Sequence, residues 1–349
     1  MYKRQALHGV NLSGWLKLEP WITPEYFAQA QVLDECAMVK SMSKQTYADL
    51  IQYHRSTFIG EIDFKNIAAR GFNAVRLCVP FYVFGDAGPF TSQFIGCADY
   101  VDQAFDWADE IGLKIVLVLD INPGNEGELS EHLPEFSSFN AYKNDALKTL
   151  SALAKRYAYR AALAGFELAA HPRIQKTFAF KRQSGIPVHL LRNYYREGYE
   201  IIRSLAGDDV LVIMPDAHEP HMWRSFMASG NYKHTMLDIH LDHFDEYFEM
   251  RGALTTQTLL AASKNYLHAA QKNGFKIMVG TWCSALPGLD SAMTPEGHIA
   301  QERIYMSDQL DLYRGCDAWF FQTWKTQGRL SGWDARHAFS SFERRMICA

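Results

Sequence analysis

Eight short apolar segments alternate with longer amphipathic segments along this chain, and the alternation restricts the fold more than any other feature. Each short segment is rich in Val, Ile, Leu or Phe, which is typical of a strand buried on both faces. The predicted strands are 8–15, 73–79, 114–120, 165–169, 209–215, 236–241, 276–282 and 318–324. The predicted helices between them are 100–111, 141–157, 190–205, 256–273 and 299–313.

This order predicts an α/β protein with a single (β/α)₈ TIM barrel that spans residues 1–349 as one domain. A doubly wound sheet is the alternative, but no Gly-rich phosphate loop follows the first predicted strand, which disfavours it. Segments 22–57 and 123–140 are longer than ordinary connections. We therefore expect them to be long loop insertions at the carboxyl-terminal face of the barrel.

Composition restricts the classes of partner. A net charge of −4 with no basic stripe argues against a nucleic-acid partner. The sequence contains no run of about 18 apolar residues, so we expect no membrane-spanning helix. The six cysteines form no CxxC or CxxH pattern, so we expect no structural zinc site. We also expect no cofactor and no bound metal. The first residues lack the apolar segment of a signal peptide, so we expect a cytoplasmic protein. The expected partner is a small-molecule or sugar ligand.

Barrel enzymes build their active sites from residues at the carboxyl ends of the strands. That rule selects candidates rich in ionisable and aromatic groups: Trp15, Lys17, Leu18, Glu19, Arg76, Pro80, Asp120, His171, Asp216, His218, His240, Asp242, Thr281, Trp282, Gln322, Trp324 and Lys325.

The segment from Gly165 to Pro172 resembles a strand that reads Gly-Ile-Glu-Leu-Leu-Asn-Glu-Pro in glycoside hydrolase family 5. The likeness is to the exo-β-1,3-glucanase branch of that family and covers nearly the whole chain. It is carried by 9–21, which is similar to the opening strand, and by 71–77, 238–240, 279–282 and 320–326. The resemblance implies that Glu19, Arg76, His240 and Trp324 belong to the frame of a sugar site, with Trp324 as the platform for the sugar ring.

The chain departs from that family at the positions that carry its chemistry. The resemblance places His171 at the general acid/base glutamate, Ala170 at the asparagine before it and Thr281 at the nucleophilic glutamate. Asp120 takes the place of a histidine, and Asp242 that of a tyrosine. A retaining glycosidase needs two carboxyl groups about 5–5.5 Å apart, so we expect ordinary retaining hydrolysis to be lost.

The leading hypothesis is a repurposed enzyme that performs acid/base chemistry of the lyase, isomerase or cyclase type on a sugar conjugate or another small hydroxylated molecule. Asp120 and His171 follow neighbouring strands, so an Asp–His pair would orient the imidazole and tune its pKa. The predicted catalytic residues are His171, Asp120, His240 and Asp242. The predicted substrate-binding residues are Glu19, Arg76, Thr281, Trp282, Trp324 and Trp15.

Two other functions remain open. The chain is either a sugar-binding protein without catalysis or an atypical glycosidase that uses other carboxylates, among them Asp120, Asp242, Glu126 and Glu128. The sequence also leaves open a structural role for His171.

Four further patterns have competing interpretations. A metal bound by Asp120, His171, His240 and Asp242 is a weaker alternative, because no HxH or HExxH spacing supports it. His218 and His221 have an HxxH spacing that metal ligands also show, but their place on a loop with Pro220 favours an ordinary solvated turn. Glu167 lies deeper along its strand than His171, which predicts a buried structural carboxylate. Several tryptophans, Trp21, Trp319 and Trp333 included, are candidates for stacking on rings.

Overall fold

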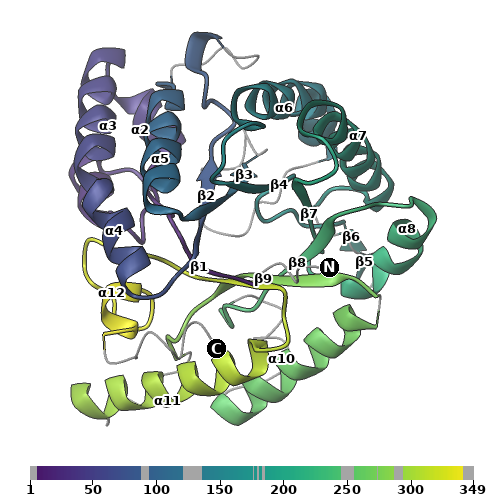
Figure 1. Cartoon of the computed structure of the whole chain (residues 1–349). Helices are drawn as coiled ribbons and strands as arrows, with labels where there is room; N and C mark the ends of the chain where they lie inside the picture. The colour runs from purple at the N-terminus through teal and green to yellow at the C-terminus, as the bar shows by residue number, and fades with distance from the viewer. Residues whose placement is uncertain are drawn as a thin grey trace.

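The computed structural model describes residues 6–87, 94–120, 136–175, 177–178, 181–182, 185–244, 255–272, 274–286 and 294–340. Eight parallel strands close into a barrel in the order β1-β10-β9-β8-β7-β4-β3-β2 (Figure 1). They are β1 (Leu7–Asn11), β2 (Ala74–Val79), β3 (Lys114–Leu119), β4 (Leu163–Glu167), β7 (Leu211–Pro215), β8 (Thr235–His240), β9 (Lys276–Trp282) and β10 (Ala318–Phe321). The predicted (β/α)₈ barrel is confirmed, with strand bounds that differ from the prediction by a few residues.

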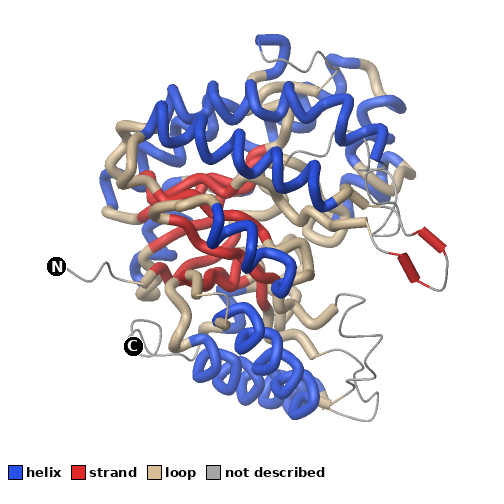
Figure 2. Tube along the Cα trace, turned by 90° about the vertical axis from the view of Figure 1, so that its right-hand side faces the viewer, coloured by secondary structure: helices blue, strands red, loops and turns tan. Residues whose placement is uncertain are grey.

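The helices surround the strands on the outside (Figure 2). They are α1 (Pro24–Ala30), α2 (Glu35–Ser41), α3 (Lys44–Phe58), α4 (Glu61–Ala69), α5 (Ala98–Ile111), α6 (Phe136–Tyr157), α7 (Val188–Ala206), α8 (Arg224–Ser229), α10 (Thr256–Gln271), α11 (Pro295–Tyr313) and α12 (Ala335–Ala338), with short 3₁₀ turns η1 (Gly85–Ala87) and η2 (Pro220–Trp223). The two-stranded ribbon of β5 (Thr177–Phe178) and β6 (Lys181–Arg182) follows β4 and protrudes from the barrel.

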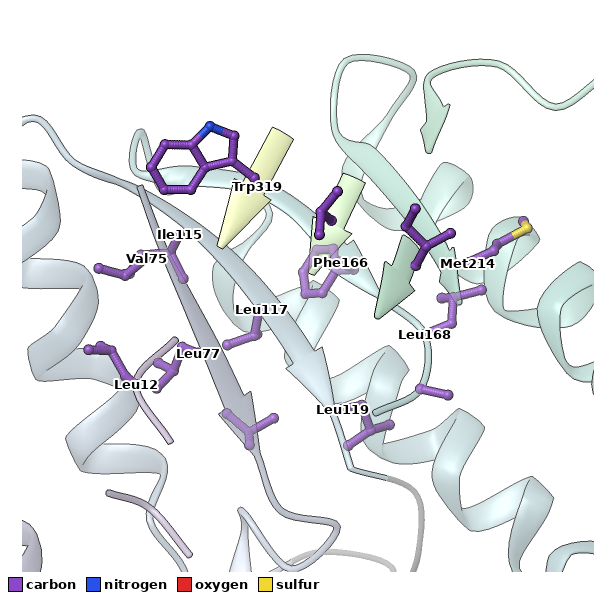
Figure 3. Packing of buried hydrophobic residues seen from close by; sticks show 14 of the residues in the cluster. Leu12, Val75, Leu77, Ile115, Leu117, Leu119, Phe166, Leu168, Met214 and Trp319 are labelled. Carbon is purple, nitrogen blue, oxygen red and sulfur yellow. The ribbon is translucent and has the colours of Figure 1, made fainter. Parts of the chain in front are cut away.

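Alternate residues of the barrel strands enter two separate apolar layers. Val75, Leu77 and Leu117 point outward into the layer beneath the helices, where Figure 3 shows them packed together. Val116 and Val118, which alternate with them, fill the barrel interior. This alternation is the period of two that a strand imposes on its side chains. It explains why the strands are apolar almost without interruption.

The long segment after β1 folds into α1, α2 and α3 and has an apolar cluster of its own. Its buried Arg55 donates hydrogen bonds to the carbonyl oxygen of Leu16 at 2.6 and 2.9 Å, and to those of Ile95 and Gly96. Arg55 therefore ties this insertion to the loop that leaves β1. The second expected insertion, 123–140, lies mostly outside the described residues, and its last five residues begin α6.

None of the helices in the described part of the chain combines the length and the apolar character needed to cross a bilayer.

Candidate functional site

A small pocket of about 190 Å³ opens at the carboxyl ends of the barrel strands. We call it the barrel-mouth pocket. Its described lining comes from the loop after β1, from β2, from the ends of β3 and β4, and from the residue after β10: Leu12, Ser13, Gly14, Leu16, Lys17, Glu19, Arg76, Cys78, Pro80, Asp120, Ala170, His171 and Gln322. Four of the expected site residues, Glu19, Arg76, Asp120 and His171, thus share one pocket.

The loop after β1 brings Glu19 to the pocket through a tight turn. Gly14 has φ +68°, and a side chain there would come within 2.6 Å of Ile22, so the turn requires glycine. The Gly14 amide donates to Glu19 Oε1 at 2.8 Å, and Trp21 Nε1 donates to Glu19 Oε2 at 3.0 Å. Burial raises the pKa of the Glu19 carboxyl above its ordinary value, while Lys17 opposes the rise.

Asp120 forms an ion pair with Lys17, whose Nζ lies 2.8 Å from Asp120 Oδ2. The expected Asp120–His171 pair was therefore wrong: among the described residues, Asp120 meets the lysine, and His171 packs elsewhere. The loop after β1 folds across the pocket and delivers an ammonium group that outcompetes a neutral imidazole for the carboxylate. Strand adjacency by itself does not reveal that crossing.

The floor of the pocket is a buried ion-pair network centred on Arg76. Its guanidinium binds Glu167 through two bonds of 2.7 and 2.5 Å, donates to Asn11 Oδ1 at 2.8 Å and lies 3.7 Å from Asp238. Burial raises the pKa of Glu167 and of Asp238 above their ordinary values, and Arg76 opposes both shifts. Glu167 is fully buried and paired, in agreement with its expected structural role.

His240 connects this network to His171. Its Nε2 lies 2.8 Å from Asp238 Oδ2, and its ring centroid lies 4.3 Å from that of His171. His218, after β7, approaches His240 from another side with a ring-centroid distance of 6.1 Å. Asp238 is held over Gly280, where a side chain would come within 2.2 Å of the carboxylate.

His171 is exposed to solvent although the barrel mouth surrounds it with protein. Its φ of 42° is in the left-handed region, which residues other than glycine seldom adopt and which recurs at functional sites. Desolvation by these surroundings, followed by the charges of His240 and Arg76, lowers the pKa of His171 below its ordinary value. The imidazole is therefore neutral at neutral pH.

One group of described residues has the spacing of metal ligands. Ligand atoms of Glu167, Asp238 and His240 lie within 4.8 Å of one another. Arg76 already supplies the cation to both carboxylates, so the group fits an ion-pair network better than a metal site. It shares only His240 with the four residues that the sequence suggested as ligands.

Three predicted catalytic or substrate-binding residues with polar side chains lie outside the described lining of the pocket: His240, Thr281 and Asp242. Thr281 is 2 % exposed, and its hydroxyl has no hydrogen-bond partner among the described residues. Asp242 Oδ1 accepts a hydrogen bond from the Phe244 amide at 3.2 Å, so this carboxylate stabilises the loop after β8. Burial raises the pKa of the Cys283 thiol, which disfavours the thiolate that a cysteine nucleophile requires.

The expected roles of three tryptophans in substrate binding were wrong. Trp15 is fully buried against Trp107 and donates to the Arg55 carbonyl, and Trp282 packs among aromatic rings of the outer layer. Trp324 donates to Asp63 Oδ1 at 2.8 Å and is 1 % exposed. Each indole is used for packing between the barrel and its covering elements, which leaves its faces inaccessible to a ligand.

Gln322 takes the pocket position that was assigned to Trp324. It lines the pocket, and its Nε2 donates to Ser13 Oγ at 2.9 Å. The inward parity of Phe320 extends to Gln322, two residues on, which agrees with the place of Gln322 among the candidates at the strand ends. The same spacing of two puts Asp238 beside His240 on one strand face, so the position of Asp238 was also predictable from the sequence.

The HxxH pair separates in the structure. His218 is half-buried and donates its backbone N–H to Asp216 Oδ1 at 3.0 Å, which closes the turn after β7, while His221 is exposed. Burial raises the pKa of Asp216 to about 7. The pair therefore forms a turn, as expected, although His218 also faces His240.

Comparison with known proteins relates this chain to sugar hydrolases. It is 28 % identical over 373 residues to the probable glucan 1,3-β-glucosidase A of Aspergillus niger, a match that covers 95 % of the chain and 86 % of the relative. The glucan 1,3-β-glucosidase of Schwanniomyces occidentalis is 26 % identical with the same coverage. The chain is homologous to glucan 1,3-β-glucosidases. No family model matches it.

Solved structures agree in fold. The rutinosidase from Aspergillus niger superposes with a TM-score of 0.74 at 16 % identity and covers 97 % of this chain and 98 % of its own. A glycoside hydrolase family 5 enzyme from Prevotella bryantii has a TM-score of 0.64 at 13 % identity, with 99 % of both chains covered. At these identities the two matches show that the chain shares the barrel fold of these enzymes.

Proposed function

We propose that this protein binds one hydroxylated unit of sugar size in the barrel-mouth pocket and performs proton-transfer chemistry on it with His171 as the general base. The observation that carries the proposal is the position of His171. It lines a small charged pocket, has a lowered pKa and packs on the His240–Asp238 pair. A neutral, accessible imidazole is the side chain best suited to accept a proton near neutral pH.

The pocket supports a polar ligand about the size of one sugar ring. Its volume of about 190 Å³ is below the roughly 300–1,000 Å³ of sites for drug-sized ligands. Lys17, Asp120 and Gln322 offer donors and acceptors that suit several hydroxyl groups. Since the homologous proteins are named for a β-glucoside bond, a β-glucoside is the first ligand class to test.

Three physical reasons argue against retaining hydrolysis at this site. Thr281 lies outside the described lining, and its hydroxyl lacks a base to activate it. Both oxygens of Glu19 already accept hydrogen bonds from Gly14 and Trp21. Asp120 is neutralised by Lys17. Lyase, isomerase or cyclase chemistry, which needs one base in place of two free carboxylates, is what remains for this site.

The test compares the wild-type protein with His171→Gln. Methyl β-glucoside and a panel of glucoside conjugates are incubated with each protein, binding is measured by calorimetry and products are followed by NMR. Removal of the base should lower turnover about 10²–10⁴-fold while binding changes little. Turnover by the wild-type protein should fall as the pH drops through the lowered pKa of His171, since protonation removes the base.

Two outcomes would replace the proposal by its alternatives. Binding without turnover of any conjugate would favour a sugar-binding protein that has no catalytic role. Release of glucose that survives His171→Gln and is lost in Asp120→Asn would favour an atypical glycosidase that uses Asp120.

A further inference from the structure

Three aromatic side chains form a row at the surface, which we call the aromatic row: Trp21, Trp333 and Phe244. The ring centroids of Trp21 and Trp333 are 5.2 Å apart, and those of Trp333 and Phe244 are 5.0 Å apart. The rings come from the chain segments after β1, β10 and β8. Three loops distant in sequence therefore converge on one apolar feature.

The aromatic row is more accessible to solvent than Trp282 and Trp324, two other large aromatic side chains near the carboxyl ends of the strands. Trp21 is 36 % exposed and Phe244 is 40 % exposed, whereas Trp282 and Trp324 are buried. Single exposed aromatic rings are common on protein surfaces and need no explanation. Exposed rings that gather into one contiguous patch are typical of a binding surface.

One direct contact and one through a neighbouring residue join the aromatic row to the barrel-mouth pocket. Trp21 Nε1 donates to Glu19 Oε2 at 3.0 Å, and Glu19 lines the pocket. The Trp333 carbonyl accepts from the Thr323 amide at 2.6 Å, next to Gln322, which lines the pocket as well. A ligand held in the pocket would therefore extend onto the row with its second part.

We infer that the aromatic row binds a flat aromatic aglycone attached to the sugar unit that occupies the pocket. The inference rests on the proposed function and adds the class of conjugate, an aryl β-glucoside. The rings of Trp21 and Trp333 are tilted by 58° and those of Trp333 and Phe244 by 45°, which forms a faceted apolar surface. The indole nitrogen of Trp21 is already bound to Glu19, so the row favours stacking over hydrogen bonds to sugar hydroxyls.

The experiment measures the dissociation constants of methyl β-glucoside, phenyl β-glucoside and the disaccharide laminaribiose by calorimetry. In the wild-type protein, the phenyl compound should bind about three- to tenfold more tightly than the methyl compound, the effect expected of one stacked ring. This ratio should fall to near one in Trp333→Ala and persist in Trp333→Phe. The control Tyr159→Ala removes a ring that is 92 % exposed away from the row and should leave the ratio unchanged.

The possible results distinguish failure of the aryl assignment from failure of the proposed function. If methyl β-glucoside binds and the phenyl compound has no advantage, or if the advantage survives both Trp333→Ala and Phe244→Ala, the inference is overturned and the proposed function stands. If Trp333→Ala weakens laminaribiose and not the phenyl compound, the row binds a second sugar, and the aryl assignment is wrong. If methyl β-glucoside does not bind to the wild-type protein, glucoside binding fails, and the inference fails with it. Circular dichroism establishes that each variant is folded, and Trp333→Phe provides the comparison if the alanine variant is not.

Discussion

The two mouths of the barrel differ in size and in how far their charged groups are shielded from water: the larger cavity has the more exposed charges. The amino-terminal mouth has the larger cavity, about 430 Å³, and the carboxyl-terminal mouth has the barrel-mouth pocket of about 190 Å³. At the amino-terminal mouth, Lys276 and Asp317 are 53 % and 37 % exposed and 3.9 Å apart. In the pocket, Lys17 and Asp120 are 25 % and 13 % exposed and 2.8 Å apart.

Shielding of the charged groups from water, and not volume, distinguishes the barrel-mouth pocket from the cavity at the amino-terminal mouth. Charges open to water are screened and contribute little to one another, whereas partly buried charges interact strongly and shift the pKa values of their neighbours. At the carboxyl-terminal mouth this shielding extends downward to the fully buried Arg76 network. The following predictions test that difference, from the largest expected effect to the smallest.

Arg76→Leu should have the largest effect. It leaves Glu167 and Asp238 buried without their cation, which is expected to lower the free energy of unfolding by about 3–5 kcal/mol. Urea unfolding followed by circular dichroism measures the change. A loss below about 1 kcal/mol would mean that solvent reaches the network, contrary to the contrast between the two mouths.

His243 should make the carboxyl-terminal end sensitive to acid. Its buried ring contacts Ser263 Oγ at 2.5 Å and the Tyr305 hydroxyl, and burial lowers the pKa of His243 to about 3. The unfolded chain takes up this proton near its ordinary pKa of about 6.5, so stability should fall as the pH drops from 6.5 towards 3. The difference in free energy of unfolding between the wild-type protein and His243→Gln should therefore shrink between pH 7 and pH 4.

Urea titrations at several pH values measure that difference. Because His171 and the carboxylates are common to both proteins, their contributions cancel in the comparison. A difference that stays constant across this pH range would show that His243 does not cause the loss of stability.

Lys17→Met should weaken binding of methyl β-glucoside about tenfold, as expected when a polar pocket loses a charged hydrogen-bond donor worth about 1.5 kcal/mol. Lys114→Met is the matched change at the amino-terminal mouth, where Lys114 lines the larger cavity. It should leave the dissociation constant unchanged. Equal losses in the two variants would remove the distinction between the mouths.

Lys276→Met should have the smallest effect. Its exposed ion pair with Asp317 is expected to contribute less than about 0.5 kcal/mol to the free energy of unfolding. Added salt should reduce this small stability difference between the variant and the wild-type protein further, because ions screen an exposed pair. A loss of several kcal/mol would indicate that the amino-terminal charges are shielded after all.

The barrel was predictable because its signal is repeated eight times. Each strand needs apolar residues on both faces, and each helix needs one apolar stripe, so local patterns report the architecture. The pocket was predictable in part for a related reason. Arg76, Asp120 and His171 follow from the rule that barrel sites form at the carboxyl ends of strands.

The tryptophans were harder to place because an indole suits a sugar platform and an aromatic core equally well by its chemistry. Position along a strand also failed for Trp324, since the chain turns after β10 and carries this ring away from the pocket to Asp63. Gln322 lines the pocket in its place. The choice depends on the path of the backbone, which hydrophobic periodicity does not report.

The sequence by itself determined the barrel, the end of the barrel that carries the site, and the residue types gathered there. Only the tertiary structure decided the pairings: Lys17 with Asp120, and His240 with Asp238 and His171. Strand and helix patterns are local, so they can be recognised within about ten residues. Ion pairs between loops depend on distances of a few ångströms between groups far apart in the chain, and folding alone sets those distances.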